Sequence, residues 1–169
     1  RGPGLSKWEM RVYEPLSAWF DITAIASKRS VNDIQNIQFP IKKLICPAQY
    51  FASMPKVIPL MFTLFGDTQW LMGFEKAVRG FDIIHSVELF NGYSAQAVRA
   101  KKKGLVKAVT LTIHENIPFT YKEFAAKMAL KQEVIEGTDR FLAINKMSQD
   151  MLLLEGVDES RICVIPQSV

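Results

Sequence analysis

The sequence predicts an α/β fold, in which helices flank a Rossmann-like, mostly parallel sheet. From residue 81 onward, short β-branched runs alternate with longer helical segments, and glycines follow the helical segments. Alternation at this spacing is typical of right-handed strand–helix–strand units. The chain has 169 residues, 49% of them hydrophobic and 22% charged. This length and composition fit one globular domain.

The regular part of the pattern covers residues 81–165. Glycine ends helices readily because it adopts the left-handed conformation without a steric penalty. Proline at 166 ends the last strand because it lacks an amide donor. The predicted strands are 81–87, 106–113, 140–144 and 161–165, and the predicted helices are 93–103, 121–135 and 147–154.

The first 80 residues show a weaker pattern. Ser6 and Glu9 have the spacing of a capping box, which predicts a short helix that stops or kinks near Pro15. Residues 20–26 and 44–46 are predicted strands. Residues 54–78 have apolar side chains at helical spacing, interrupted at Gly66 and Gly73. The apolar stretch 51–74 is broken by prolines and an aspartate, so we expect it to pack in the core or lie against a membrane surface.

Charge and cysteine content narrow the function classes only slightly. The formal net charge of +4 suits anionic partners such as nucleotide diphosphates or acidic lipid headgroups. Cys46 and Cys163 both lie in apolar runs, which favours buried, reduced thiols in a cytoplasmic protein. With only two histidines, we expect no zinc site.

Polar residues follow several predicted strands. Ligands of open α/β sheets bind beyond the carboxyl ends of the strands, so these residues are site candidates. In addition, the glycines that precede the helix starting at Ser6 could form a cradle for an anion. The candidates are Gly2 and Gly4 in the glycine turn, Glu88, Asn91 and Gly92 after strand 81–87, and His114, Glu115 and Asn116 after strand 106–113.

Each candidate also has a purely structural interpretation. Glu88 could cap the following helix, and His114 could be a hydrogen-bonded structural histidine. The glycine turn could be an ordinary turn. Lys101–Lys103 ends a predicted helix, where cations complement the helix dipole, and we expect a solvated face there.

Four segments resemble glycosyltransferase family 4. They are Asp82–Glu88, Val109–His114, Arg140–Ser148 and Leu154–Pro166. The last is the most specific, since it is similar to the pattern "L-x-x-x-G-V-x-x-x-K-I-x-V-I-P" over more than a dozen positions. The resemblance covers residues 81–169 well and residues 1–80 loosely.

The resemblance implies a GT-B architecture, with two Rossmann-like domains facing a cleft. Residues 1–169 would be the N-terminal, acceptor-side domain of a retaining glycosyltransferase (hexosyltransferase-like) that needs no cofactor and no metal. Its donor would be a nucleotide-diphosphate sugar. By the same resemblance, His114 would face the donor sugar and Gly2 and Gly4 the diphosphate. The acceptor side would be lined by Glu88, Asn91, Gly92, Glu115 and Asn116.

Three features depart from the family pattern. A strand is expected before the glycine turn, a second donor-binding domain is expected after the first, and Gln167–Ser168 stands where Asn-Gly is usual. We therefore expect the segment to be inactive without the C-terminal domain of the same protein. The other expected partners are a nucleotide-sugar and a sugar or lipid-linked acceptor, but no nucleic acid. We expect a cytoplasmic location that allows peripheral contact with the membrane.

Two other functions remain open from the sequence. One is a non-catalytic Rossmann-like module that binds a ligand or a protein. The other is a different nucleotide-sugar enzyme such as an epimerase, which a glycine-rich fingerprint after a first strand would favour.

Overall fold

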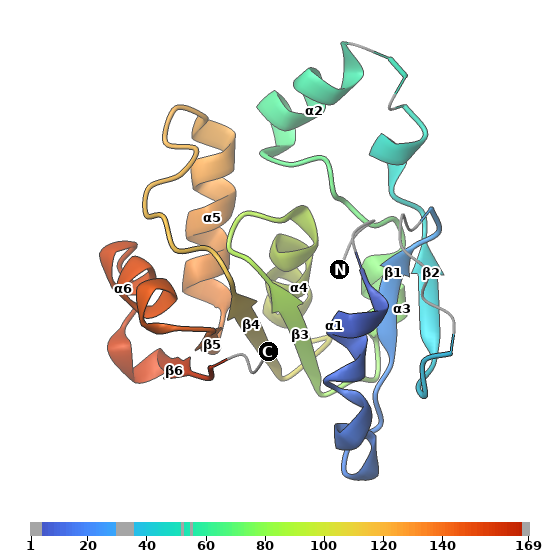
Figure 1. Cartoon of the computed structure of the whole chain (residues 1–169). Helices are drawn as coiled ribbons and strands as arrows, with labels where there is room; N and C mark the ends of the chain where they lie inside the picture. Colours follow the sequence, from blue (N-terminus) through green and yellow to red (C-terminus); the bar gives the residue numbers. More distant parts are fainter. Residues whose placement is uncertain (1–4, 30–35, 52, 55, 167–169) are drawn as a thin grey trace.

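Strands and helices alternate along most of the chain in the computed structural model (Figure 1), which describes residues 5–29, 36–51, 53–54 and 56–166. Short 3-10 helices at Glu14–Ala18, Pro47–Gln49 and Glu159–Arg161 connect the main elements. These are α1 (Lys7–Arg11), β1 (Ala24–Ser27), β2 (Ile41–Leu44), α2 (Val57–Phe65), α3 (Phe74–Val78), β3 (Ile83–Val87), α4 (Gly92–Lys102), β4 (Ala108–Ile113), α5 (Ala125–Gly137), β5 (Arg140–Ala143), α6 (Lys146–Leu154) and β6 (Ile162–Val164).

All the paired strands are parallel, and they form two sheets. β3, β4, β5 and β6 lie side by side in that order, while β1 and β2 form a separate pair. The α/β class with a Rossmann-like, mostly parallel arrangement is therefore confirmed, although we expected a single sheet. Since parallel strands point the same way, β3 and β4 bring their carboxyl ends to one edge.

The larger sheet is packed on one face by helices. Along β4, Val109, Leu111 and Ile113 are fully buried, and they belong to one core together with residues of α4 and α5. The alternate residues Thr110 and Thr112 are only half-buried, as the two-residue period of a strand requires. α4 and α5 approach closely at Gly137, where an added Cβ would lie 2.0 Å from Val98 Cγ1.

The N-terminal elements match the sequence predictions less closely. The capping box is present, since Glu9 Oε2 accepts hydrogen bonds from Ser6 N and Ser6 Oγ, and α1 ends before Pro15. Gly66 and Gly73 interrupt the helices as predicted, with φ of 70° and 77°. The predicted strands 20–26 and 44–46 differ from the observed ones. β1 begins four residues after position 20, and β2 ends at Leu44.

The two cysteines differ in burial. Cys46 is buried and Cys163 is exposed, and both are free thiols. The prediction that both are buried is wrong for Cys163, because β6 is the edge strand of its sheet. Within the described residues, no helix has the length and apolar character needed to cross a membrane.

Candidate functional site at the carboxyl edge of β3 and β4

Glu88 follows β3 directly and turns the chain out of the sheet. Its φ is 62°, in the left-handed region. This conformation costs a residue with a Cβ about 1–2 kcal/mol, and it persists where surrounding contacts enforce it. Glu88 is therefore held in an unfavourable backbone conformation at the edge where ligands of such sheets bind.

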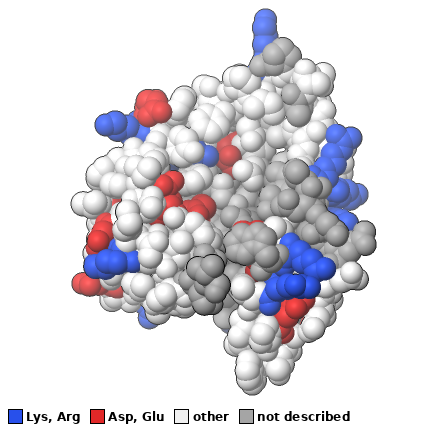
Figure 2. Space-filling model, in the orientation of Figure 1, with Lys and Arg blue, Asp and Glu red and all other residues white. Residues whose placement is uncertain are grey.

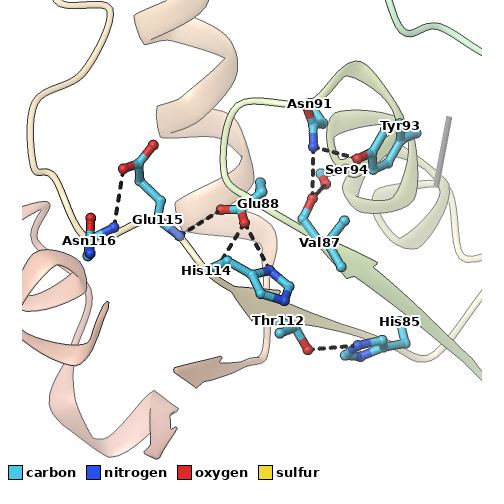
Figure 3. A network of polar contacts seen from close by, with 10 residues as sticks. All are labelled: His85, Val87, Glu88, Asn91, Tyr93, Ser94, Thr112, His114, Glu115 and Asn116. Carbon is cyan, nitrogen blue, oxygen red and sulfur yellow. Dashed lines mark hydrogen bonds and ion pairs between the residues drawn. The ribbon is translucent and has the colours of Figure 1, made fainter. Parts of the chain in front are cut away.

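The Glu88 carboxylate joins the ends of the two strands (Figure 3). Its Oε1 accepts hydrogen bonds from His114 N at 3.0 Å and from His114 Nδ1 at 3.1 Å. Its Oε2 accepts a hydrogen bond from Glu115 N at 3.4 Å. The residue that caps α4 is Asn91, so the interpretation of Glu88 as a helix cap is wrong. Glu88 and His114 are therefore in contact at the carboxyl ends of β3 and β4, and the site roles predicted for them stay predictions.

This contact sets the chemistry of the His114 ring. An ionised carboxylate only accepts hydrogen bonds, so Nδ1 carries a proton. The second ring nitrogen, Nε2, has no hydrogen-bond partner among the described residues, and 27% of the side chain is exposed. In the neutral ring Nε2 is an acceptor, so His114 can take a hydrogen bond from a ligand hydroxyl.

His85 lies two residues before the end of β3 and is engaged differently. Its Nδ1 lies 2.8 Å from Thr110 Oγ1 and its Nε2 lies 3.0 Å from Thr112 Oγ1, so both ring nitrogens have partners. Loss of solvation lowers the pKa of His85 to about 4. His85 is an exposed residue, so solvent weakens this effect, but a pKa lowered from 6.5 leaves the ring neutral at pH 7.

Asn91 and Gly92 follow Glu88 in the chain, and both are buried. Asn91 Nδ2 donates hydrogen bonds to Val87 O at 3.2 Å and to Tyr93 Oη at 2.5 Å. Gly92 N donates to Asp67 Oδ2 at 2.5 Å. These groups shape the start of α4, and their predicted role in acceptor binding stays a prediction.

Glu115 and Asn116 begin the loop that follows His114. Glu115 Oε1 accepts hydrogen bonds from Asn116 N at 3.2 Å and from Ile117 N at 3.1 Å, which tightens the turn. Asn116 is exposed. Glu115 thus contacts Glu88 through its backbone amide, and Asn116 lies beyond Glu115; their predicted role in acceptor binding stays a prediction.

The glycine turn cannot be placed against this site, because Gly2 and Gly4 lie outside the described residues. Among residues 5–29, 36–51, 53–54 and 56–166, no three His, Cys, Asp or Glu side chains are grouped so as to hold a metal ion.

The sequence analysis missed a buried ion pair close to the start of α4. Lys127 Nζ lies 3.4 Å from Asp67 Oδ1, and both side chains are buried. The rings of Phe62, Phe90 and Tyr121 surround the ammonium group at 5.0 to 5.3 Å. Burial lowers the pKa of Lys127, and the neighbouring Asp67 opposes this shift. The available signal was that Asp67 is the sole acidic residue between positions 34 and 74.

A family model described as Glycosyltransferase Family 4 matches residues 20–169. No curated protein and no solved structure matches the chain significantly. The matched range includes β3 and β4, and therefore both residues of the Glu88–His114 pair.

Proposed function

The chain belongs to glycosyltransferase family 4, and from this premise we propose that the edge carrying Glu88 and His114 is the acceptor-side half of a sugar-transfer site. The proposal rests on the contact in which Glu88 Oε1 accepts hydrogen bonds from both the backbone amide and the ring of His114. This contact orients a histidine whose second nitrogen is unpartnered among the described residues. Transfer of a glycosyl group depends on such prior positioning of hydrogen-bonding groups.

In this proposal His114 is the residue that touches the sugar. Its Nε2 accepts a hydrogen bond from a hydroxyl group of the donor sugar and thereby fixes the anomeric carbon against the acceptor. The bond between that carbon and the leaving phosphate oxygen breaks, and the bond to the acceptor oxygen forms with retention of configuration. The acceptor proton leaves with the departing diphosphate.

Glu88 acts through His114 as a positioning residue. Its carboxylate holds Nδ1 protonated and favours the tautomer that leaves Nε2 free. Asn91, Gly92, Glu115 and Asn116 would line the acceptor side, as the family resemblance implies.

The remaining parts of the proposal follow from the family resemblance. The donor is a nucleotide-diphosphate sugar, a second α/β domain of the same protein binds it, and the present segment alone transfers nothing. The transfer needs no metal. The acceptor is a sugar or a lipid-linked sugar, and the two free thiols fit a reducing, cytoplasmic compartment.

The test is a His114→Ala variant of the full protein, assayed for transfer or hydrolysis with a panel of nucleotide-sugars. Loss of one positioned hydrogen-bonding group is expected to lower kcat/KM about 100- to 1,000-fold. The midpoint of thermal unfolding is expected to move by less than about 3 °C, because the side chain is partly exposed and Glu88 Oε1 keeps its hydrogen bond from His114 N. Glu88→Gln is expected to lose about tenfold, since an amide still accepts from Nδ1 but without charge.

His85→Ala is the matched control, because both ring nitrogens of His85 are already bonded within the sheet. It is expected to leave kcat/KM within about threefold of the unchanged protein. If His114→Ala lost activity and stability to the same extent, the role of His114 would be structural. Binding of nucleotide-sugars without turnover by the full protein would favour a non-catalytic binding module.

A further inference from the structure

The loop that joins β4 to α5, residues 115–124, is held in an unfavourable backbone conformation. Phe119 and Tyr121 have φ of 59° and 64°, in the left-handed region, although neither is a glycine. Between them, Thr120 Oγ1 is buried and has no hydrogen-bond partner among the described residues. Strained residues and unpaired polar atoms persist only where surrounding contacts enforce them. A specific contact must therefore hold this loop in place.

That contact is a carboxylate at the end of α6. Glu155 Oε1 accepts hydrogen bonds from Phe119 N in the loop and from Lys131 Nζ in α5. In Figure 1 the loop runs on the α6 side of α5 before it enters that helix. One oxygen atom therefore joins the loop to two helices, across 36 and 24 positions of the sequence.

The pair of Lys131 and Glu155 is buried. Figure 2 shows charged side chains scattered over one face of the molecule, where water solvates them. The side chains of Lys131 and Glu155 are instead only 3% and 5% exposed. Removing two charges from water costs about as much as their attraction returns, and an apolar pair of similar size is often at least as stable. The packing of the two helices alone therefore gives no reason for an ion pair here.

Glu155 is also unfavourably placed for α6 itself. It is the residue at which α6 ends, and a negative charge at the C-terminal end of a helix opposes the helix dipole. An apolar side chain at this position would avoid the costs of both burial and the dipole, but it could not accept a hydrogen bond from Phe119 N. The property that only a polar side chain supplies here is a hydrogen-bond acceptor for the loop.

The near end of the same loop is tied to the candidate site. Glu88 Oε2 accepts a hydrogen bond from Glu115 N at 3.4 Å. Phe119 follows Glu115 by only four positions, and Pro118 between them has a fixed φ. A short, stiff segment thus runs from one carboxylate anchor, Glu88, to the other, Glu155. The position of this segment depends on both anchors.

We propose that Glu155 is a positioning residue for the acceptor side of the site. It fixes the loop through Phe119 N, and Lys131 supplies the counter-charge that the burial of its carboxylate requires. This role rests on the sugar transfer proposed above, in which Glu115 and Asn116 line the acceptor side.

The proposal predicts a specific change in the kinetics. When position 155 carries no hydrogen-bond acceptor, the loop relaxes from its left-handed conformations and the acceptor substrate binds less tightly. His114 is held by Glu88 through two hydrogen bonds of its own, so the chemical step is largely retained. The KM for the acceptor substrate should therefore rise while kcat changes little.

The test compares two double variants of the full protein that differ only at position 155. Lys131→Met with Glu155→Leu removes both charges and also removes the hydrogen-bond acceptor for Phe119 N. Lys131→Met with Glu155→Gln removes both charges and keeps an accepting oxygen. Neither double variant contains the uncompensated buried charge that a single substitution would leave, so both are expected to fold.

Two measurements are made on each double variant. Relative to the Glu155→Gln double variant, the Glu155→Leu double variant is expected to raise the KM for the acceptor substrate about tenfold, with kcat within about threefold, since one hydrogen bond is lost. Its amide hydrogen exchange in residues 115–121 is expected to be about tenfold faster, with exchange in β4 equal in the two. The Glu155→Gln double variant is expected to stay within about threefold of the unchanged protein in both measurements.

Three results would overturn the proposal. Equal KM and equal loop exchange in the two double variants would show that the bond to Phe119 N holds nothing in place. Faster loop exchange with an unchanged KM would show that the loop is anchored but takes no part in binding the acceptor substrate. A fall in kcat with an unchanged KM would place the effect on His114 instead.

Failure of the proposed sugar transfer is distinguishable from these results. If the unchanged protein transferred no sugar, the role of Glu155 at the site would be overturned together with the transfer. The exchange measurement needs no activity, so it would still decide whether Glu155 anchors the loop.

Discussion

In residues 81–166 the strands β3, β4 and β5 are each followed by a helix, whereas in residues 5–79 two short strands pair alone and α2 keeps its apolar side chains at the surface. The main core draws mostly on the first of these regions. The second region has its own small cluster of buried residues, namely Leu5, Met10, Ala26 and Phe39.

The two regions therefore carry different kinds of surface. The polar edge with Glu88 and His114 lies at the ends of the paired parallel strands β3 and β4, and strands hold side chains more accurately than loops do. α2 packs Ile58 and Met61 against the main core and leaves Leu60, Leu64 and Phe65 exposed. The Asp67–Lys127 pair and the Phe62 ring contacts join the two regions.

The largest expected effect tests whether the two regions unfold together. Phe141 is fully buried in the main core, and Phe39 is 7% exposed in the small cluster. Phe141→Ala is expected to lower the free energy of unfolding by about 3–5 kcal/mol, as measured by denaturant titration. Phe39→Ala is expected to raise amide hydrogen exchange in β1 and β2 and to leave β4 protected, since weakly packed regions open locally.

Equal loss of protection in β1 and β4 after Phe39→Ala would break this comparison. The chain would then be one cooperative unit, and the small cluster would be part of the main core in energetic terms.

The next effect concerns the ion pair between the two regions. Asp67→Asn keeps an oxygen for Gly92 N but leaves Lys127 without a counter-charge. The expected loss of stability at pH 7 is about 3 kcal/mol, near the low end for a broken buried pair. Adding Lys127→Met should restore most of it, because the uncompensated buried charge is then removed.

The pH dependence of Asp67→Asn sharpens this test. Burial lowers the pKa of Lys127 below its ordinary 10.5. Between the folded-state pKa and 10.5 the unfolded chain binds more protons, so stability rises with pH in that window. Denaturant titrations at neutral and alkaline pH would measure this, and additive losses in the double variant would contradict a direct interaction.

The sequence predicted the helix-covered region, residues 81–166, well. The predicted strand 140–144 became Arg140–Ala143, and the helix 147–154 became Lys146–Leu154. Apolar periodicity and terminal glycines are local signals, and they agree with the tertiary structure here. The short strands of residues 5–79 were misplaced, because a two-stranded sheet leaves little burial to create a periodic pattern.

The candidate site was predictable in part for a similar reason. Residues that follow parallel strands converge at one edge, so Glu88 and His114 could be predicted to meet. The burial of Lys127 and Lys131 could not, because lysines in a helix usually face solvent. Each is paired with an acidic residue, 60 and 24 positions away in sequence, which only the tertiary structure brings close.

The smallest expected effect tests whether surface charge also holds the helix-covered region together. Arg99 of α4 donates to both carboxylate oxygens of Glu133 in α5, at 3.0 and 2.7 Å. These hydrogen bonds lower the pKa of Glu133 below its ordinary 4.5. Its contribution is present above pH 4.5 and is lost as the pH falls through the folded-state value, since the unfolded chain then binds more protons.

Glu133→Gln is therefore expected to cost only about 0.5 kcal/mol at pH 7, because Arg99 is exposed and the pair is screened by solvent. It should also flatten the acid limb of the curve of unfolding free energy against pH, whereas Glu136→Gln on the same helix should change neither. If Glu133→Gln costs as much as Asp67→Asn, the α4–α5 contact depends on charge more than on the close packing at Gly137. Residues 81–166 would then be held together no more by buried packing than residues 5–79 are.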